Sequence, residues 1–453
     1  MAQFILLPLY TRYLTPSDYG ILSSVQVMNS VLVLLYTLAL NRAIFRLYFD
    51  FKTEKEKRDY LGTIFIGISI SAVVITSIIF SLSDIIGSIY KSIDFYPYMS
   101  LSILASAITT FFLVPKTAYF VKEKANIFVL LSIIEFFTRN IFILVFVVFL
   151  EKGVLGYLQG QLAGNLLLLI LFLFLTWKQV NFRFVKSFFV KSLRFSLPLL
   201  PMTLSAWVMN WSDRIFIERN FDTHDVGIYS LGYKIAMIIA IFSDSFYKAY
   251  NPHYFKTASN KPKEIALKSL KKTNTLYLLV VILFCSLIVL FAKEGISLLF
   301  DFRYYEAYKI VGIVGLAYVF GKAIGIFNLA IYQSKKTIFV MTASIIGAFV
   351  NIGLNFLLIH KYGAYGAAWA TVITYFAMMF FTYYYARKCF YASFNKPIVY
   401  LAFVMMLLLN VGFYIINMNL INSIVLKIII VLGISIFIWF RYKKELKIIL
   451  KKV

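Results

Sequence analysis

The chain has 453 residues, of which 61% are hydrophobic and only 14% are charged, and its mean hydropathy is +0.83. A soluble protein carries about a quarter charged residues, so this composition excludes a soluble domain as the main body of the chain. The formal net charge of +25 is compatible with nucleic-acid binding, but the positions of the cations argue against that interpretation, as shown below.

Apolar runs of about 20 residues, which is the length of a helix that crosses a ~30 Å hydrocarbon layer, recur along the whole chain. We therefore predict an all-α integral membrane protein of about 14 transmembrane helices. The first predicted span is too short to cross a bilayer alone, so we expect native sequence to be missing upstream of Met1. In chain order the predicted spans are 1–11, 20–41, 61–82, 98–118, 127–149, 156–177, 195–218, 226–250, 273–292, 305–331, 338–359, 366–386, 397–417 and 424–440.

The cysteines and histidines do not indicate special chemistry. Cys285 and Cys389 lie in or beside predicted helices about a hundred residues apart, as ordinary buried thiols do. His224, His253 and His360 lie far apart in the sequence and lack the spacing of metal ligands. The sequence therefore predicts neither a metal site nor a cofactor.

Lysine and arginine are distributed unevenly between the predicted loops. If the loop after the second span is cytoplasmic, the loops and tail on that side contain 30 of the 45 Lys and Arg residues, and the opposite loops, Lys427 included, contain nine. This asymmetry follows the positive-inside rule. It predicts a cytoplasmic C terminus, and a cytoplasmic N terminus if there are fourteen spans. Contact with anionic lipid headgroups accounts for the net charge, so we do not expect nucleic-acid binding.

Two pairs of short segments match at nearly the same offset. Leu14–Ser23 and Phe221–Ser230 share an Asp, a Gly, an Ile and a Ser at an offset of 207 residues. Gly153–Gly156 and Gly363–Gly366 share their two glycines at an offset of 210 residues. Because this offset covers six spans, both halves have the same orientation. We therefore predict a parallel repeat about an axis along the membrane normal.

The repeat predicts how the chain is divided. Residues 1–194 form an N-terminal six-helix lobe with a truncated first helix, and residues 195–390 form a C-terminal six-helix lobe. Residues 391–453 form helices 13 and 14 and a basic cytoplasmic tail. In such folds the cargo binds between the lobes, which rock around it.

Three segments carry a resemblance to a known family. Leu7–Gly20 (LPLYTRYLTPSDYG) is similar to the opening signature of bacterial lipid-linked oligosaccharide flippases, the polysaccharide biosynthesis proteins of the MATE-like exporter superfamily. Asn41–Phe49 (NRAIFRLYF) and Ser212–Ile217 (SDRIFI) resemble further parts of the family pattern. The resemblance covers the whole chain in the number and spacing of the spans, and the short first span departs from it.

This resemblance implies a protein of the bacterial inner membrane that moves undecaprenyl-diphosphate-linked oligosaccharide repeat units to the outer leaflet by alternating access. The units would serve O-antigen, capsule or a similar polymer, with polymerase or glycosyltransferase partners. It also implies two six-helix bundles around a V-shaped, cationic central cavity.

Cations at membrane depth are the candidate substrate-binding residues, because such residues are costly and usually face a bundle interior or a water-filled cavity. Lys322 lies thirteen residues from Lys309 and from Lys335. That is about 20 Å of helix, too far for its side chain to reach an interface. A lipid diphosphate would need such cations to replace its lost hydration. The candidates are Lys322, Arg139, Lys234, Arg12, Arg214, Arg42, Arg46 and Lys116.

A simpler interpretation applies to several of these residues. Opposite charges at i,i+4 spacing can neutralise each other inside a packed bundle, and the pairs are Glu135/Arg139, Arg214/Glu218 and Asp244/Lys248. Lys116 lies near a span end, where a lysine can snorkel to the interface. Lys234 and Lys322 have no acid at i±3 or i±4, which favours a cavity-facing position for both.

The acidic residues suggest two further roles. Asp213, Asp244 and Glu135 are the candidates for binding a coupling proton or Na⁺. Asp18 precedes a helical run and is predicted to cap it.

Two other functions stay open. A cation-coupled multidrug exporter of the same fold would need acids in its cavity, whereas the deep charges here are mostly basic. A membrane polymerase or glycosyltransferase would need a sizeable outer loop or an acidic metal-binding motif, and the sequence contains no Asp-x-Asp. The sequence therefore favours a transporter over an enzyme.

Overall fold

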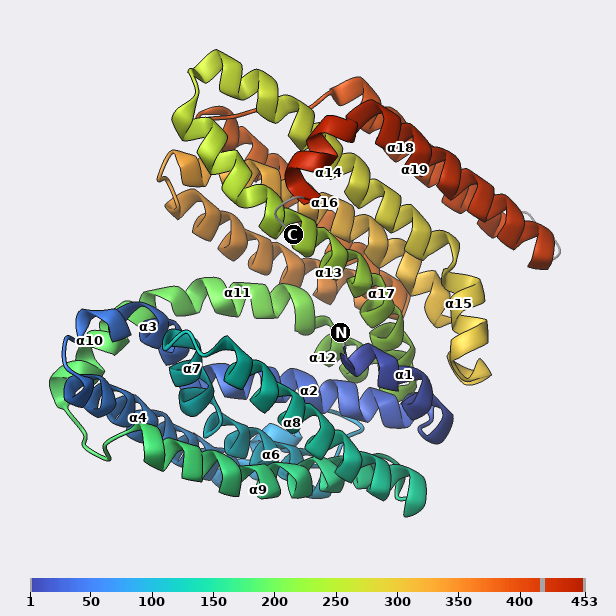
Figure 1. Cartoon of the computed structure of the whole chain (residues 1–453). Coiled ribbons are helices and arrows are strands. Elements are labelled where there is room, and N and C mark those ends of the chain that lie inside the picture. Colours follow the sequence, from blue (N-terminus) through green and yellow to red (C-terminus); the bar gives the residue numbers. More distant parts are fainter. Residues whose placement is uncertain (1, 416–419, 451–453) are drawn as a thin grey trace. The chain divides into compact units, whose positions relative to one another are not determined.

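The structure, a computed structural model, describes residues 2–415 and 420–450. These residues are almost entirely helical, and no strand occurs among them (Figure 1). Within these ranges, eleven helices are long and apolar enough to cross a membrane. The all-α membrane fold predicted from the sequence is thus confirmed.

The chain divides into two compact units, Met1–Gly227 and Ile228–Val453. The helices of the first unit are α1 (Ala2–Tyr13), α2 (Pro16–Thr37), α3 (Leu40–Leu47), α4 (Glu54–Ser81), α5 (Ser83–Gly87), α6 (Ser100–Thr110), α7 (Leu113–Val121), α8 (Ala125–Leu144), α9 (Gly153–Gln179), α10 (Lys186–Ser196), α11 (Leu200–Trp211) and α12 (Asp213–Asn220). The remaining helices are α13 (Thr223–Asn260), α14 (Lys263–Leu290), α15 (Ala292–Leu299), α16 (Ala307–Gln333), α17 (Ile338–Arg387), α18 (Lys396–Ile415) and α19 (Leu420–Leu450).

The predicted count of fourteen spans is not confirmed, for reasons that the backbone makes clear. The predicted spans 338–359 and 366–386 are joined in α17 across a kink at Gly363 (φ 55°, ψ −136°). The predicted span 195–218 is broken into α10, α11 and α12, and Pro198 and Pro201 lie at the first break, between α10 and the start of α11. Proline interrupts a helix because it lacks an amide hydrogen and clashes with the preceding turn. The short first helix, α1, has only 12 residues.

The segments that match at an offset of 207 residues begin their helices in the same way. The Thr15 hydroxyl accepts a hydrogen bond from the Asp18 amide (3.1 Å), and the Asp18 carboxylate accepts one from the Thr15 amide (2.9 Å). This is a capping box at the start of α2. At the equivalent place in α13, the Asp222 carboxylate accepts from the Asp225 amide at 2.9 Å. Asp18 therefore takes part in capping α2, as predicted. It is the third residue of this helix, which begins at Pro16 and not at residue 20.

The glycines that match at an offset of 210 residues also have equivalent conformations. Gly153 and Gly363 both have a positive φ, 54° and 55°. Three residues later, Gly156 and Gly366 both lie against the end of the preceding helix. A Cβ atom would lie 2.6 Å from the Phe146 carbonyl oxygen in one case and would overlap a backbone carbonyl in the other. Only glycine permits this approach, and the shared geometry supports the predicted repeat.

Gly20 and Gly227 form a reciprocal contact within the first unit. A Cβ atom on Gly20 would overlap the carbonyl oxygen of Thr223, and one on Gly227 would overlap the carbonyl oxygen of Pro16. Pro16 and Thr223 are themselves 207 residues apart. The contact thus has the pattern of a two-fold related pair, in which i meets j and j meets i.

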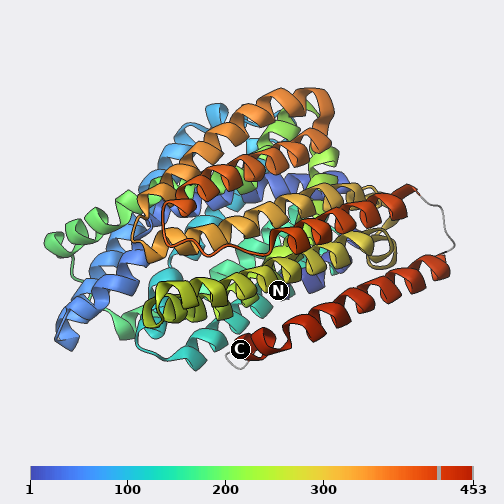
Figure 2. The same ribbon diagram turned by 90° about the horizontal axis from the view of Figure 1, so that it is seen from above.

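The packing inside each unit brings together the helices that carry intramembrane charges. In the first unit α9 packs against both α6 and α8, and α7 packs against α8. In the second unit α14 packs against α16, α18 and α19 (Figure 2). Side chains from helices that are distant in the sequence therefore meet within each unit.

Candidate functional site: cations within the membrane helices

The first candidate site is a network of four side chains from three helices. Lys116 on α7 donates to Glu135 on α8 at 2.6 Å, and Arg139, one turn along α8, donates to the other oxygen of Glu135 at 2.9 Å. The Arg139 Nε atom also donates to the amide oxygen of Asn165 on α9 at 3.0 Å. The Asn165 amide nitrogen donates to the Ala105 carbonyl of α6 at 3.0 Å. We refer to Lys116, Glu135, Arg139 and Asn165 as the Glu135 network.

The Glu135 network carries an excess of positive charge. It contains two cations and one carboxylate, and the charged side chains are only 18–23% exposed. Asn165 is completely buried. The predicted Glu135/Arg139 pair is confirmed, whereas the snorkelling interpretation of Lys116 is wrong, because Lys116 bonds to the same carboxylate. A sequence pattern within one helix could not reveal this second cation.

The second candidate site is an ion pair between two helices of the second unit. Lys322 on α16 donates to Asp244 on α13 at 2.5 Å. The lysine side chain is 15% exposed and the aspartate side chain is 53% exposed. The expected Asp244/Lys248 pairing is therefore replaced by a pairing across helices. Lys234 lies half-buried on α13, ten residues before Asp244.

Arg214 lies at the junction of α11 and α12 and is almost completely buried. Its guanidinium donates to Asp213 at 2.6 Å and to the Asn210 carbonyl at 2.5 Å, and the Arg214 and Asp213 side chains are 3% and 2% exposed. The expected Arg214/Glu218 pairing is wrong. Glu218 is fully buried and accepts hydrogen bonds from the backbone amides of Lys91 (2.9 Å) and Ser92 (2.5 Å). The loop amides thus occupy the carboxylate that the i,i+4 rule assigned to Arg214.

The other candidate cations lie at the surface. Arg12 is exposed at the end of α1, and Arg42 and Arg46 are exposed on α3. Arg46 donates to Asp50 at 2.8 Å, and Lys191 donates to the second oxygen of Asp50 at 2.9 Å. Hydrogen bonds from Lys191 and Arg46 hold the pKa of the Asp50 carboxyl below its usual range. Within the described structure, Arg42 and Arg46 do not join the Glu135 network.

Two polar contacts inside the second unit were missed by the sequence analysis. Lys427, which we assigned to an outer loop, lies within α19, is 3% exposed and donates to Glu294 on α15 at 2.5 Å. The loop assignment was wrong, because Lys427 lies inside a helix. The ion pair was missed because no local pattern connects two residues so distant in the sequence. Asn351 and Asn355, buried one turn apart on α17, are linked by a hydrogen bond of 3.1 Å. Their spacing of four residues within a predicted span was visible in the sequence, but these side chains are uncharged and were not among the candidates.

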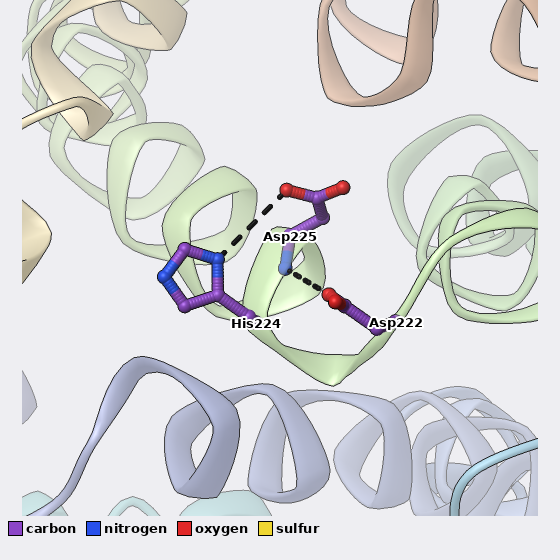
Figure 3. Close-up of side chains that lie close together, drawn as sticks. All are labelled: Asp222, His224 and Asp225. Carbon is purple, nitrogen blue, oxygen red and sulfur yellow. Dashed lines mark hydrogen bonds and ion pairs between the residues drawn. The ribbon is translucent and has the colours of Figure 1, made fainter.

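Asp222, His224 and Asp225 gather at the start of α13 (Figure 3). They include the ligand types of a metal site, with the His224 Nδ1 atom 3.9 Å from an Asp225 carboxylate oxygen. Asp222 and His224 are exposed, and the capping bond from Asp222 to the Asp225 amide accounts for the arrangement. The cluster is therefore explained as a helix cap.

The helical fold, with eleven helices among the described residues that are long and apolar enough to cross a membrane, defines a multi-pass membrane protein. Residues 1–258, more than half of the chain, match the family described as polysaccharide biosynthesis protein. The chain belongs to this family, which confirms the resemblance found in its sequence.

Comparison with individual proteins adds one sequence relative and several solved structures of similar fold. A protein of the Lsg locus of Haemophilus influenzae is 26% identical over 286 residues, which cover 60% of this chain and 66%, or just under two thirds, of that protein. The lipid II flippase MurJ, in an inward closed conformation, matches with a TM-score of 0.75 at 14% identity. The match covers 97% of this chain and 96% of the MurJ chain. An inward-facing multidrug resistance MATE family transporter matches with a TM-score of 0.62 at 13% identity, over 84% of this chain and 92% of the transporter chain. At these identities the solved structures establish a shared MATE-like fold.

Proposed function

We propose that this protein is a flippase that moves an undecaprenyl-diphosphate-linked oligosaccharide repeat unit from the cytoplasmic to the outer leaflet of the bacterial inner membrane. The family match supports a role in polysaccharide biosynthesis. The observation that carries the proposal is the Glu135 network, where two cations share one carboxylate inside the membrane helices. Such an excess of positive charge favours an anionic cargo.

The network offers a way to receive a diphosphate without exposing bare charges. Phosphate oxygens can replace one oxygen of Glu135 as the acceptor for Arg139, whose planar guanidinium can donate two parallel hydrogen bonds. Lys116 then keeps the carboxylate neutralised. In the Lys322–Asp244 pair, a phosphate oxygen can likewise replace the Asp244 carboxylate as the acceptor for Lys322. The isoprenoid tail stays in the lipid while the head and sugar pass between two six-helix lobes, residues 1–194 and 195–390.

The other predicted residues have supporting roles in this proposal. Arg42 and Arg46 lie where a cytoplasmic diphosphate would first dock, and Arg12, Arg214 and Lys234 are further cations along the route. Asp213, Asp244 and Glu135 are the candidates for binding a coupling ion. Glycosyltransferase and polymerase partners would supply the repeat unit and consume it, on opposite faces of the membrane.

The experiment that tests the proposal locates the lipid-linked repeat unit in cells that lack this gene. An impermeant glycosidase or lectin is applied to vesicles of known orientation. We expect the repeat unit to accumulate on the cytoplasmic face and the surface polymer to be lost. Accumulation on the outer face would instead indicate a polymerase or ligase, and an unchanged glycolipid would contradict the flippase.

A cation-coupled multidrug exporter is the second candidate. One observation favours it: in the Lys322–Asp244 pair the carboxylate is the more exposed partner. An exposed acid within a transporter can bind a cationic drug or a coupling ion. Drug susceptibility of the same deletion strain distinguishes the two functions, because a drug exporter predicts sensitisation with surface polymer intact.

A further inference from the structure

A polar cavity of about 520 Å³ lies in the second unit where α14 and α19 meet the segment that precedes α18. Three lysines from about one and a half turns of α14 form one wall, and the kinked end of α19 forms another. We refer to this cavity as the basic pocket. Its lining residues are Lys268, Lys271, Lys272, Thr275, Asn395, Arg441, Tyr442 and Glu445.

Packing and hydrogen bonds hold the walls of the basic pocket together. The helical geometry of α19 is interrupted at Tyr442 (φ −126°, ψ 23°), whose side chain is 6% exposed and belongs to a core cluster with Leu270 of α14. The Asn395 amide donates to Thr275 at 2.8 Å, and the buried Asn274 donates to the Ala392 carbonyl at 2.7 Å. The cavity is therefore a built feature of the fold.

The charges that line the basic pocket are strongly unbalanced. Lys268, Lys271, Lys272 and Arg441 face a single carboxylate, Glu445. Within the described ranges, none of the four cations forms an ion pair with a carboxylate. Like charges at i,i+3 and i,i+4 spacing repel each other on a helix. Lys268 therefore repels Lys271 and Lys272, which destabilises this part of α14 unless an anion lies between the three lysines. An anion in the cavity would relieve this repulsion.

The position of the basic pocket along α14 indicates the source of that anion. Directly after Lys272, α14 enters a continuous buried stretch from Thr273 to Ile282. The pocket thus lies at the end of a membrane-spanning segment, on the side that the positive-inside distribution predicts to be cytoplasmic. Basic pockets between transmembrane helices on this side bind the headgroups of anionic lipids.

We propose that the basic pocket binds a phosphate-bearing anion, and that the phosphate belongs to the headgroup of an anionic phospholipid of the cytoplasmic leaflet. A free phosphate would use the same four cations, so the experiment must distinguish the two sources. This proposal stands independently of the flippase assignment, because it depends only on a cavity at the end of α14.

The test uses the full-length protein in neutral detergent and a fluorescent short-chain phosphatidylglycerol, with phosphatidylcholine as the uncharged comparison. A pocket variant carries K268Q, K271Q and R441Q. A matched control carries K256Q, K261Q and K263Q, which remove the same charge from exposed positions outside the pocket. At about fivefold per cation, we expect the pocket variant to bind phosphatidylglycerol about a hundredfold more weakly. The control should change binding by no more than about twofold.

A second variant keeps the test decisive if the triple variant does not fold. E445Q removes the one carboxylate of the pocket, and we expect it to tighten phosphatidylglycerol binding about fivefold. Inorganic phosphate that displaces the lipid only at far higher concentration supports the headgroup as the source. Equal affinity for inorganic phosphate overturns the lipid assignment. An equal loss in the pocket and control variants, or no gain in E445Q, overturns the basic pocket as a binding site.

Discussion

At the scale of single residues, Arg139 is held in place by two partners. They are Glu135 on its own helix and Asn165 on α9, and Asn165 is itself bonded to the backbone of α6. A partly buried guanidinium with defined partners can present its remaining donors to a ligand in a fixed orientation. Asn165 thus acts as a positioning residue for Arg139.

Arg139→Ala should abolish surface polymer export, while Arg139→Lys should reduce export about tenfold, because lysine keeps the charge but loses the planar fork. Export is measured by immunoblotting of surface polymer, and membrane insertion by the level of a tagged protein. Lys336→Gln removes one charge from an exposed position and should leave export unchanged. Normal export by Arg139→Ala at normal protein levels would rule out a role for the Glu135 network.

Asn165→Ala should lower the free energy of unfolding by about 1–3 kcal/mol, because it leaves the partly buried Arg139 and the carbonyl of the buried Ala105 without their partner. Thermal unfolding of the purified protein measures this loss. If Asn165 also positions Arg139, Asn165→Ala alone should reduce export. The double variant Arg139→Lys/Asn165→Ala should then export as much polymer as Arg139→Lys alone. Independent, multiplicative effects of the two changes would contradict a positioning role.

The Lys322–Asp244 pair separates an anionic cargo from a cationic one. Lys322→Ala should abolish binding of an anionic lipid, whereas Asp244→Asn, which releases the lysine, should retain that binding. A cation exporter predicts the reverse for a cationic drug, because Asp244 would then be the ligand. Binding of a fluorescent lipid diphosphate and of a cationic drug to both purified variants compares the two proposed functions with a single ion pair, and binding does not depend on ion coupling.

At the scale of the elements, glycines define how the helices meet. The first turns of α2 and α13 approach so closely that a methyl group on either Gly20 or Gly227 would overlap a backbone carbonyl. Backbone atoms cannot rotate away as a side chain can, so the helices themselves would have to separate.

Gly20→Ala and Gly227→Ala should each destabilise the protein by about 1–3 kcal/mol. Gly295 provides the matched control, because it lies in α15 and a Cβ atom there would meet nothing within 4 Å. Gly295→Ala should stabilise its helix by about 0.5–1 kcal/mol. Apparent melting temperatures of the three variants check both signs. A Gly20→Ala protein as stable as the original would contradict the close crossing.

At the scale of the whole molecule, the distribution of lysine and arginine gives a prediction of topology. Lys427 belongs to the interior of α19, so removing it from the count of outer loops strengthens the asymmetry. Green fluorescent protein fused after residue 453 should fluoresce, and alkaline phosphatase fused there should be inactive. Fusions after Lys152 and Lys361 should give the opposite result. An active phosphatase at the C terminus would invert the predicted topology.

The fold class and the family could be predicted from the sequence alone, and the equivalent glycine geometries support the predicted repeat. These properties depend on patterns that a local reading can detect: apolar runs of membrane length, charge asymmetry between loops, and matched glycines. The capping role of Asp18 followed from a local pattern of the same kind, because a cap involves neighbouring residues, whereas the positive φ of Gly153 and Gly363 was not predicted.

Which charges pair could not be predicted from the sequence and depends on how the helices pack. The i,i+4 rule identified Glu135 with Arg139, but Lys116, Lys322 and Glu218 found partners on other elements. Within a low-dielectric bundle a charge takes the nearest partner that packing supplies, and that partner depends on which helices lie side by side. The span count is not confirmed for a related reason: prolines and a glycine kink alter the length of the helices without altering the hydrophobicity of the sequence.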